Sequence, residues 1–227
     1  MTIAPLIIFA LLLPFIFWAV YHYYHDRHRP EPVGNLVLCI LLGVAAAWLN
    51  RGMYAGLDVL GLRHDAFELA LDNLPGLFVY SVLGIGVTEE LSKLLLYVAV
   101  VIRLRAFDEP LDGIVYASFL ALGFSFVENL HYLQFVSTTE AFARGFAGPI
   151  VHIVFASVWA YPIALARLEN RSVWLVGAQW LAVSAVLHGI YDFIAIAFEG
   201  TALVLAAALV LALWIWRLLL LRRLARG

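Results

Sequence analysis

Seven apolar stretches recur along the 227 residues of the chain, each approaching the length that a helix needs to cross a bilayer. The chain is 64% hydrophobic and 13% charged, whereas soluble domains are about 45–50% apolar and about 25% charged. We therefore predict an all-α, polytopic transmembrane helix bundle that forms one integral membrane domain over residues 1–227. The predicted spans are 4–24, 34–50, 75–102, 111–136, 147–167, 173–198 and 201–221.

The connection between the second and third spans, Arg51 to Asn73, is too short of apolar residues to cross a membrane. After Arg51 it carries five further charged side chains, namely Asp58, Arg63, Asp65, Glu68 and Asp72. We predict an amphipathic surface stretch or a loop here.

The positions of the arginines predict the orientation of the bundle. Cytoplasmic connections of membrane proteins are enriched in Lys and Arg. Ten arginines lie on one side of the predicted topology and three on the other. The amino terminus is therefore expected outside and the carboxyl terminus in the cytoplasm, as in a multi-pass protein of the inner (cytoplasmic) membrane. The formal net charge of −2 argues against a nucleic-acid partner, and the single cysteine, Cys39, allows neither a disulfide nor a CxxC metal site.

Three charged side chains interrupt the span 75–102, namely Glu89, Glu90 and Lys93. A charge near the centre of a membrane helix costs about 2.5–3.5 kcal/mol on insertion scales. Each glutamate lies three or four residues from Lys93 and so shares a helix face with it. We expect Lys93 to tune the glutamates by keeping at least one ionised, and we read the cluster as functional.

Further polar side chains lie inside the next three spans, namely Glu128, Asn129, His152, His188 and Asp192. At 1.5 Å per residue, the ionisable ones lie with Glu89 at about 20–28 Å from the predicted cytoplasmic edge. This shared depth predicts a single polar layer in the outer half of the membrane. His188 and Asp192 are four residues apart, so Asp192 can accept from one ring nitrogen and orient the other inward.

Two forms of water activation fit this set of residues. Glu128, His152 and His188 would make a zinc site with an open fourth position, with Glu89 or Glu90 as the general base. Without a metal, one glutamate and His152 would activate water, while His188 and Asn129 would stabilise the oxyanion. The residues leave both forms open.

Structural roles compete with the functional ones. Glu128 could pair with Lys93, and Asn129 could make a hydrogen bond between helices. The cluster His22, His25 and His28 lies beside Arg27 and Arg29, and is expected to anchor the first span at the lipid headgroups.

Four motifs in this order resemble those of the PrsW-type intramembrane proteases, in the superfamily that includes CAAX-processing and bacteriocin-immunity membrane proteases. They are Glu89-Glu90-x-x-Lys93, Phe124-x-x-x-Glu128-Asn129, His152 followed by Phe155-Ala156-Ser157, and His188-Gly-x-Tyr-Asp192. The resemblance covers about 75–195 and implies a catalytic core over 75–198, with the spans 4–24, 34–50 and 201–221 as scaffold.

The resemblance implies an endopeptidase that cuts a membrane-anchored, single-span protein, such as an anti-sigma factor, near the extracytoplasmic side. CAAX proteases have a histidine where this chain has Glu128, so their residue roles do not transfer directly. The family is described both as metalloproteases and as glutamic-type proteases, and both stay open here. The alternative function is a proton- or cation-coupled transporter that uses the same carboxylates, although no internal repeat typical of transporters is evident.

Overall fold

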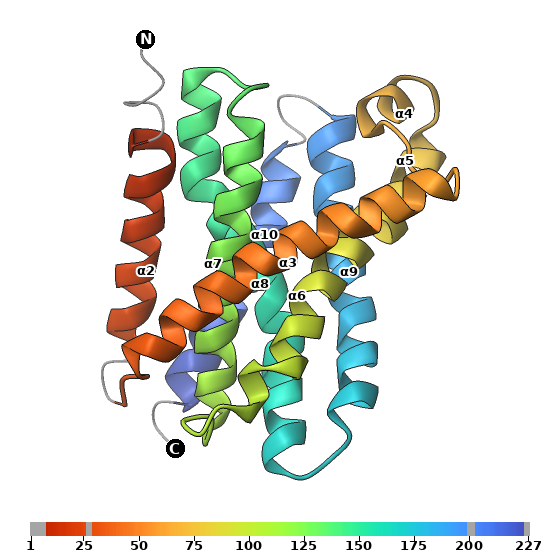
Figure 1. The fold of residues 1–227 in the computed structure, drawn as a ribbon. Coiled ribbons are helices and arrows are strands. Elements are labelled where there is room, and N and C mark those ends of the chain that lie inside the picture. The colour runs from red at the N-terminus through yellow and green to blue at the C-terminus, as the bar shows by residue number, and fades with distance from the viewer. Residues whose placement is uncertain (1–7, 26–28, 199–202, 225–227) are drawn as a thin grey trace.

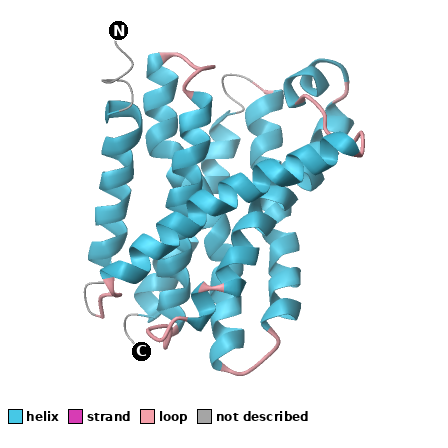
Figure 2. Cartoon of the chain, in the orientation of Figure 1, coloured by secondary structure: helices cyan, strands magenta, loops and turns pink. Residues whose placement is uncertain are grey.

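The computed structural model describes residues 8–25, 29–198 and 203–224, and within these ranges every regular element is a helix. The elements form a bundle that places the amino-terminal and carboxyl-terminal ends on opposite sides (Figures 1 and 2). In chain order they are η1 (Ile8–Leu12), α2 (Leu13–His25), α3 (Val33–Val59), α4 (Ala66–Asp72), α5 (Leu74–Tyr80), η2 (Ser81–Gly86), α6 (Val87–Ala99), η3 (Val101–Arg103), α7 (Pro110–Tyr132), α8 (Thr138–Leu168), α9 (Val173–Ala197) and α10 (Leu203–Leu224). The predicted all-α membrane bundle is confirmed.

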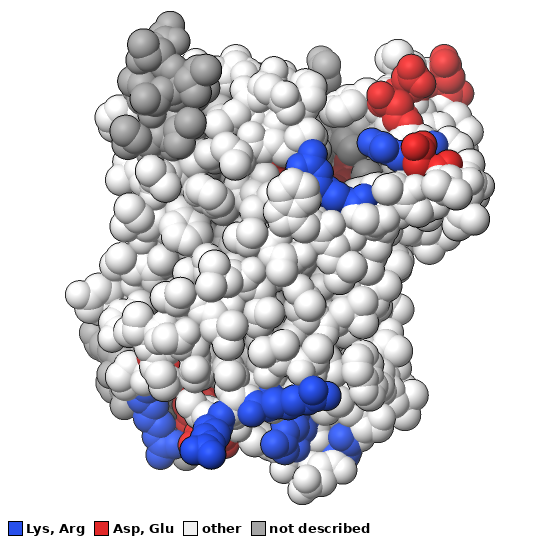
Figure 3. Space-filling view, viewed as in Figure 1, with Lys and Arg blue, Asp and Glu red and all other residues white. Residues whose placement is uncertain are grey.

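Five helices in the described ranges are long and apolar enough to cross a membrane, namely α3, α7, α8, α9 and α10. The other two predicted spans correspond to η1 with α2, and to the interrupted run α5–η2–α6. Residues 4–7 and 201–202 of the predicted spans lie outside the described residues. Figure 3 shows basic side chains gathered at the end where the chain finishes and acidic ones over α4 at the opposite end. This distribution agrees with the predicted orientation, which stays a prediction together with the count of seven spans.

Two boundaries differ by nine residues from those predicted. Helix α3 continues through Arg51 to Val59, so the stretch that begins at Arg51 is helical for nine further residues. At 1.5 Å per residue, α3 is about 40 Å long, and it runs obliquely across α7 and α6 (Figure 1), with Arg51 exposed on its surface. Helix α8 begins at Thr138, where Ser137 and Glu140 form a capping box, and not at 147.

Helices α7 and α8 form the centre of the bundle. About 78% of the most apolar window of each is buried, against 33% for α3 and 11% for α10. A helix that is apolar all round is buried by its neighbours, and α7 is such a helix from Ile114 to Ser125. Trp159 on α8 and Tyr97 on α6 are fully buried at this centre, with ring centroids 5.0 Å apart. The polar side chains of the site therefore depend on this core for their positions.

The run α5–η2–α6 carries the two glutamates to the core. The Asn73 side chain accepts from the Gly76 N–H at 2.9 Å and caps α5, and η2 is a π-helical turn directly before α6. Such turns are frequent at functional sites. η2 lies against α9 at a close crossing, where a Cβ on Gly86 would come 2.4 Å from the Ala185 carbonyl oxygen. A Cβ on Gly189 would likewise come 2.5 Å from Val82 Cα.

The substitution Gly86→Ala is therefore expected to destabilise the protein, because backbone atoms of α9 cannot move aside as a side-chain end can. Overpacking of this kind costs about 1–3 kcal/mol. Gly56→Ala is the matched control, because Gly56 lies on α3 with nothing within 4 Å of a Cβ. The thermal unfolding midpoint in detergent should fall for Gly86→Ala alone. Equal midpoints for the two variants would contradict the close crossing.

Candidate active site

Glu90 lies at the centre of a buried polar network on α6. Its Oε1 accepts from Lys93 Nζ at 2.6 Å and lies 2.8 Å from His188 Nδ1. Its Oε2 accepts from Trp159 Nε1 at 2.9 Å. Glu90 and Lys93 side chains are both fully buried. The expected pairing of Lys93 with a glutamate is thus present.

Glu89 faces a different direction, since consecutive helical residues point about 100° apart. Its Oε2 lies 3.9 Å from His152 Nδ1 and 3.8 Å from His188 Nε2. This oxygen is buried and has no hydrogen-bond donor among the described residues. Of the two adjacent glutamates, Glu89 is therefore the one that faces both imidazoles and can act on a further group.

His152 on α8 is held from both sides of its ring. Nε2 lies 2.5 Å from Glu128 Oε2, and Nδ1 lies 3.4 Å from Lys93 Nζ. The ring also packs against Phe124 of the second motif, with centroids 5.1 Å apart. Glu128 therefore contacts His152, and not Lys93 as the structural alternative proposed.

His188 on α9 is oriented by Glu90 and not by Asp192 as predicted. Nδ1 contacts Glu90, while Asp192 Oδ2 lies 3.6 Å from Nε2, beyond hydrogen-bond distance. The ring stacks on Phe155 at 4.6 Å between centroids. Because Glu90 reaches His188 from another helix, spacing within the sequence could not identify it as the orienting carboxylate. The Nε2 nitrogen is left facing Glu89 and Asp192.

Two further contacts were missed at the sequence level. Arg144 Nη2 lies 3.3 Å from Glu128 Oε1, and it is near the site because α8 begins nine residues earlier than expected. Trp159 follows His152 by seven residues, two helical turns, and so shares its face. The capping box at Ser137 and this spacing were the signals available in the sequence.

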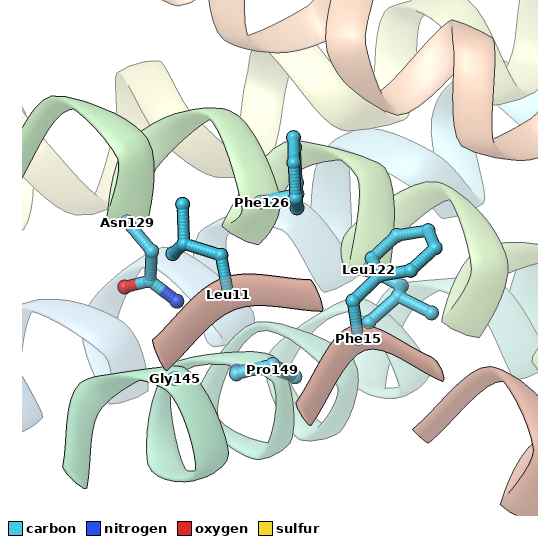
Figure 4. A pocket seen from close by; sticks show the side chains of 7 residues that line it. All are labelled: Leu11, Phe15, Leu122, Phe126, Asn129, Gly145 and Pro149. Carbon is cyan, nitrogen blue, oxygen red and sulfur yellow. The ribbon is translucent and has the colours of Figure 1, made fainter. Parts of the chain in front are cut away.

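Asn129 lies in a separate packing site. Its Nδ2 is 3.2 Å from the Arg144 carbonyl oxygen and 3.4 Å from Ser125 Oγ. The side chain lines a cavity of about 10 Å³ together with Leu11, Phe15, Leu122, Phe126, Gly145 and Pro149 (Figure 4). Such a volume holds about one water molecule. These contacts favour the helix–helix hydrogen bond over an oxyanion role for Asn129.

The geometry of Glu89, His152 and His188 fits a metal ion. Each offers a ligand atom, and these atoms all lie within 4.8 Å of one another. Two ligand atoms on one tetrahedral zinc ion lie about 3.4 Å apart, close to the 3.8 and 3.9 Å measured from Glu89 Oε2. The predicted set used Glu128 in place of Glu89. Since Glu128 is at hydrogen-bond distance from His152, the geometry favours Glu128 as the group that orients this ring.

A buried carboxylate that faces two imidazoles, inside a bundle of apolar helices, is an arrangement that can hold a metal ion or activate water in a membrane enzyme. The chain belongs to the PrsW family: the model described as PrsW family intramembrane metalloprotease matches residues 31–219. It is therefore a multi-pass membrane protease, a hydrolase that acts on peptide bonds. This membership gives no support to the transporter alternative.

Curated relatives agree with the family. Protease PrsW of Bacillus subtilis (strain 168) is 31% identical over 192 residues, which cover 83% of this chain and 82% of the relative. Protease PrsW of Clostridioides difficile (strain 630) is 30% identical over 197 residues, covering 83% of this chain and 79% of that protein. Protease PrsW of Oceanobacillus iheyensis is 29% identical over 204 residues, 89% of this chain and 88% of the relative. No solved structure gives a significant match.

Proposed function

We propose that the protein cleaves a single-span membrane protein, such as an anti-sigma factor, near the extracytoplasmic side of the inner membrane. The core 75–198 would carry the reaction on α6 to α9, with the other spans as scaffold. Exposure differs across the site: the side chains of Glu128 and Asp192 are 23% and 18% exposed, whereas those of Glu90 and Lys93 are fully buried. On the predicted orientation, water would enter through the exposed part of the site on the extracytoplasmic side.

The position of Glu89 Oε2 is the observation that carries this proposal. A carboxylate oxygen that is buried without a hydrogen-bond donor loses its hydration with no compensation. A water molecule or a metal ion is therefore expected to bind this oxygen. Water held between Glu89 and the two histidines would be polarised by them and would attack the carbonyl carbon of the scissile peptide. Its proton would pass to the amine nitrogen as the C–N bond breaks. Glu90 and Glu128 would keep the imidazole rings of His188 and His152 in the required directions.

In the metal-dependent form, Glu89, His152 and His188 would hold zinc. A bound zinc ion supplies Lewis acidity, which lowers the pKa of water and polarises a carbonyl group. Asp192 is then the carboxylate placed to accept the proton, because its Oδ2 lies near His188 without a hydrogen-bond donor in the described ranges. The Lys93 ammonium group lies 3.4 Å from His152 Nδ1, and its ion pair with Glu90 would neutralise its charge beside this ligand atom.

In the glutamic form, Glu89 itself is the general base. His152 would then share the water, with its Nδ1 beside both Glu89 and the Lys93 ammonium group. His188 Nε2 would donate to the developing oxyanion. Both forms require Glu89, and they differ in whether its oxygen binds a metal or a proton.

Metal content distinguishes these two forms. The protein is purified without chelator or metal-affinity resin, and metals are measured by mass spectrometry for the wild type and for His188→Ala. About one zinc per chain, lost in His188→Ala, is expected from the metal-dependent form, because three protein ligands make such a site. Glu128→Gln should retain zinc more fully than Glu89→Gln if Glu128 only orients His152.

Cleavage of a single-span reporter in proteoliposomes completes the test. In the metal-dependent form, a chelator should stop cleavage and added zinc should restore it. A metal-free wild type whose cleavage survives chelation would overturn the zinc assignment and leave the glutamic form. Absence of cleavage for any single-span reporter, with zinc bound, would contradict the proposed substrate class.

A further inference from the structure

A second buried polar cluster surrounds Arg217 on α10, away from the site described above. Arg217 was counted among the basic residues that close the chain at the cytoplasmic surface, but it is only 1% exposed. Its Nε donates to Ser157 Oγ at 3.0 Å, and its Nη2 donates to Ser118 Oγ at 2.8 Å. Nη2 also lies 3.3 Å from His22 Nδ1. The expected headgroup position of His22 is therefore wrong, since this ring is buried beside Arg217.

The contacts of Arg217 do not neutralise its charge. Ser118 and Ser157 each donate their own hydroxyl proton to a carbonyl oxygen of their helix, at 2.7 Å, and so offer Arg217 only neutral lone pairs. No described carboxylate lies within ion-pair distance of Arg217, and its Nη1 has no hydrogen-bond partner in the described ranges. The guanidinium carbon lies 5.3 Å from the centre of the Trp214 ring, a cation–π contact that supplies no counter-charge. A guanidinium without an anionic partner inside a membrane protein is costly.

A groove lies at this cluster, between α2, α7 and α10. It has a volume of about 880 Å³, within the usual range of about 300–1,000 Å³ for small-molecule sites. Arg217, His22 and Arg222 line its polar part, whereas Val20, Leu218 and Leu221 line its apolar part. The groove therefore offers positive charge and an apolar wall to one and the same ligand.

We propose that this groove binds one anionic glycerophospholipid, with its phosphate at Arg217 and an acyl chain along the apolar wall. Arg217 and Arg222 are five residues apart, which is about 7.5 Å along the helix at 1.5 Å per residue. At this separation Arg217 would contact the lipid phosphate while Arg222 contacts the rest of the headgroup. On the predicted orientation this end of α10 lies in the cytoplasmic leaflet, where basic pockets between helices bind anionic lipids. The bound lipid would join α2 and α10 to the central helix α7 and so support the bundle.

Native mass spectrometry of the full chain in a mild detergent tests this proposal. The protein is titrated with dioleoyl phosphatidylglycerol and, separately, with dioleoyl phosphatidylcholine, which has the same chains and no net charge. One phosphatidylglycerol should bind at least about fivefold more tightly than phosphatidylcholine, because both lipids carry the phosphate but the choline cation of phosphatidylcholine would be repelled by Arg217 and Arg222. Arg217→Gln should remove this preference.

Two further variants make the result specific to the groove. Arg223→Gln removes the same charge from the same helix, but Arg223 is exposed and does not line the groove, so the preference should persist. Val20→Trp fills the apolar part of the groove from a position that is 47% exposed, and it should weaken lipid binding without disturbing the fold. This variant keeps the test valid if Arg217→Gln does not fold.

Three outcomes would overturn the proposal. The first is equal binding of the two lipids by the wild type. The second is undiminished phosphatidylglycerol binding in Val20→Trp, or an undiminished preference for phosphatidylglycerol in a folded Arg217→Gln. The third is displacement of the lipid by millimolar inorganic phosphate alone, which would make Arg217 a site for free phosphate.

Discussion

Replacement of Glu89 by glutamine is expected to abolish cleavage of a single-span reporter while leaving the protein folded. The change keeps the shape of the side chain but removes the charge that faces His152 and His188. Loss of a general base or a metal ligand lowers rates by at least about 10²–10⁴-fold. Glu89 makes no ion pair shorter than 3.8 Å among the described residues, so the thermal midpoint should change little. Reporter cleavage and thermal unfolding are measured on the same preparation.

Glu68→Gln is the matched control for this substitution. Glu68 is an exposed glutamate on α4, outside the polar network, and its neutralisation should leave cleavage at the wild-type rate. A Glu89→Gln variant that cleaves as fast as Glu68→Gln would remove Glu89 from the mechanism. If Glu89→Gln loses cleavage and its thermal midpoint also falls well below that of the wild type, Glu89 has a structural role.

The second large effect concerns Glu90. Glu90→Gln leaves the Lys93 ammonium group buried without its counter-charge and weakens the contact that orients His188. Removal of one member of a buried ion pair costs about 3–5 kcal/mol, so we expect a large fall in the thermal midpoint. The double variant Glu90→Gln/Lys93→Met removes both charges and should recover most of that stability. It should not recover cleavage, because neither His188 nor His152 regains its charged neighbour.

An exposed pair provides the comparison. Glu169 and Arg171 are 2.7 Å apart with about half of each side chain exposed, and such pairs contribute about 0–1 kcal/mol. Glu169→Gln should therefore leave the midpoint almost unchanged. If Glu90→Gln matched Glu169→Gln in stability, the buried pair would not support the core as argued. If the double variant cleaved normally, Glu90 would not orient the site.

Most of the fold follows from patterns along the chain, and the differences have physical causes. Apolar length predicted the helices α3, α7, α8, α9 and α10, since helix formation in a bilayer depends on local backbone hydrogen bonds. The end of α3 was misplaced because Arg51 was read as the end of the apolar stretch. An oblique helix of 27 residues can carry a charge at the polar boundary and continue. The tilt of a membrane helix is set by its packing on neighbouring helices, and a hydropathy profile carries no information on that packing.

The composition of the site was also accessible from the sequence. Glu89, Glu90, Lys93, His152 and His188 were identified because ionisable groups are costly in apolar helices and are kept for function. The structure brings Glu89, His152 and His188 together and adds Arg144 and Trp159. It also moves Asn129 into a packing contact with α8. These pairings join residues up to about a hundred positions apart, and no periodicity within a helix encodes them.

The amino-acid sequence by itself determined that this chain is a helical membrane protein with carboxylates and imidazoles at one depth. It did so because burial of apolar residues and the cost of buried charge act on each residue locally. Only the tertiary structure decided which glutamate faces the histidines and which one holds His188 and Lys93. That choice depends on the rotation of α6 against α8 and α9, and directly before α6 the π-helical turn η2 packs closely on α9 at Gly86 and Gly189.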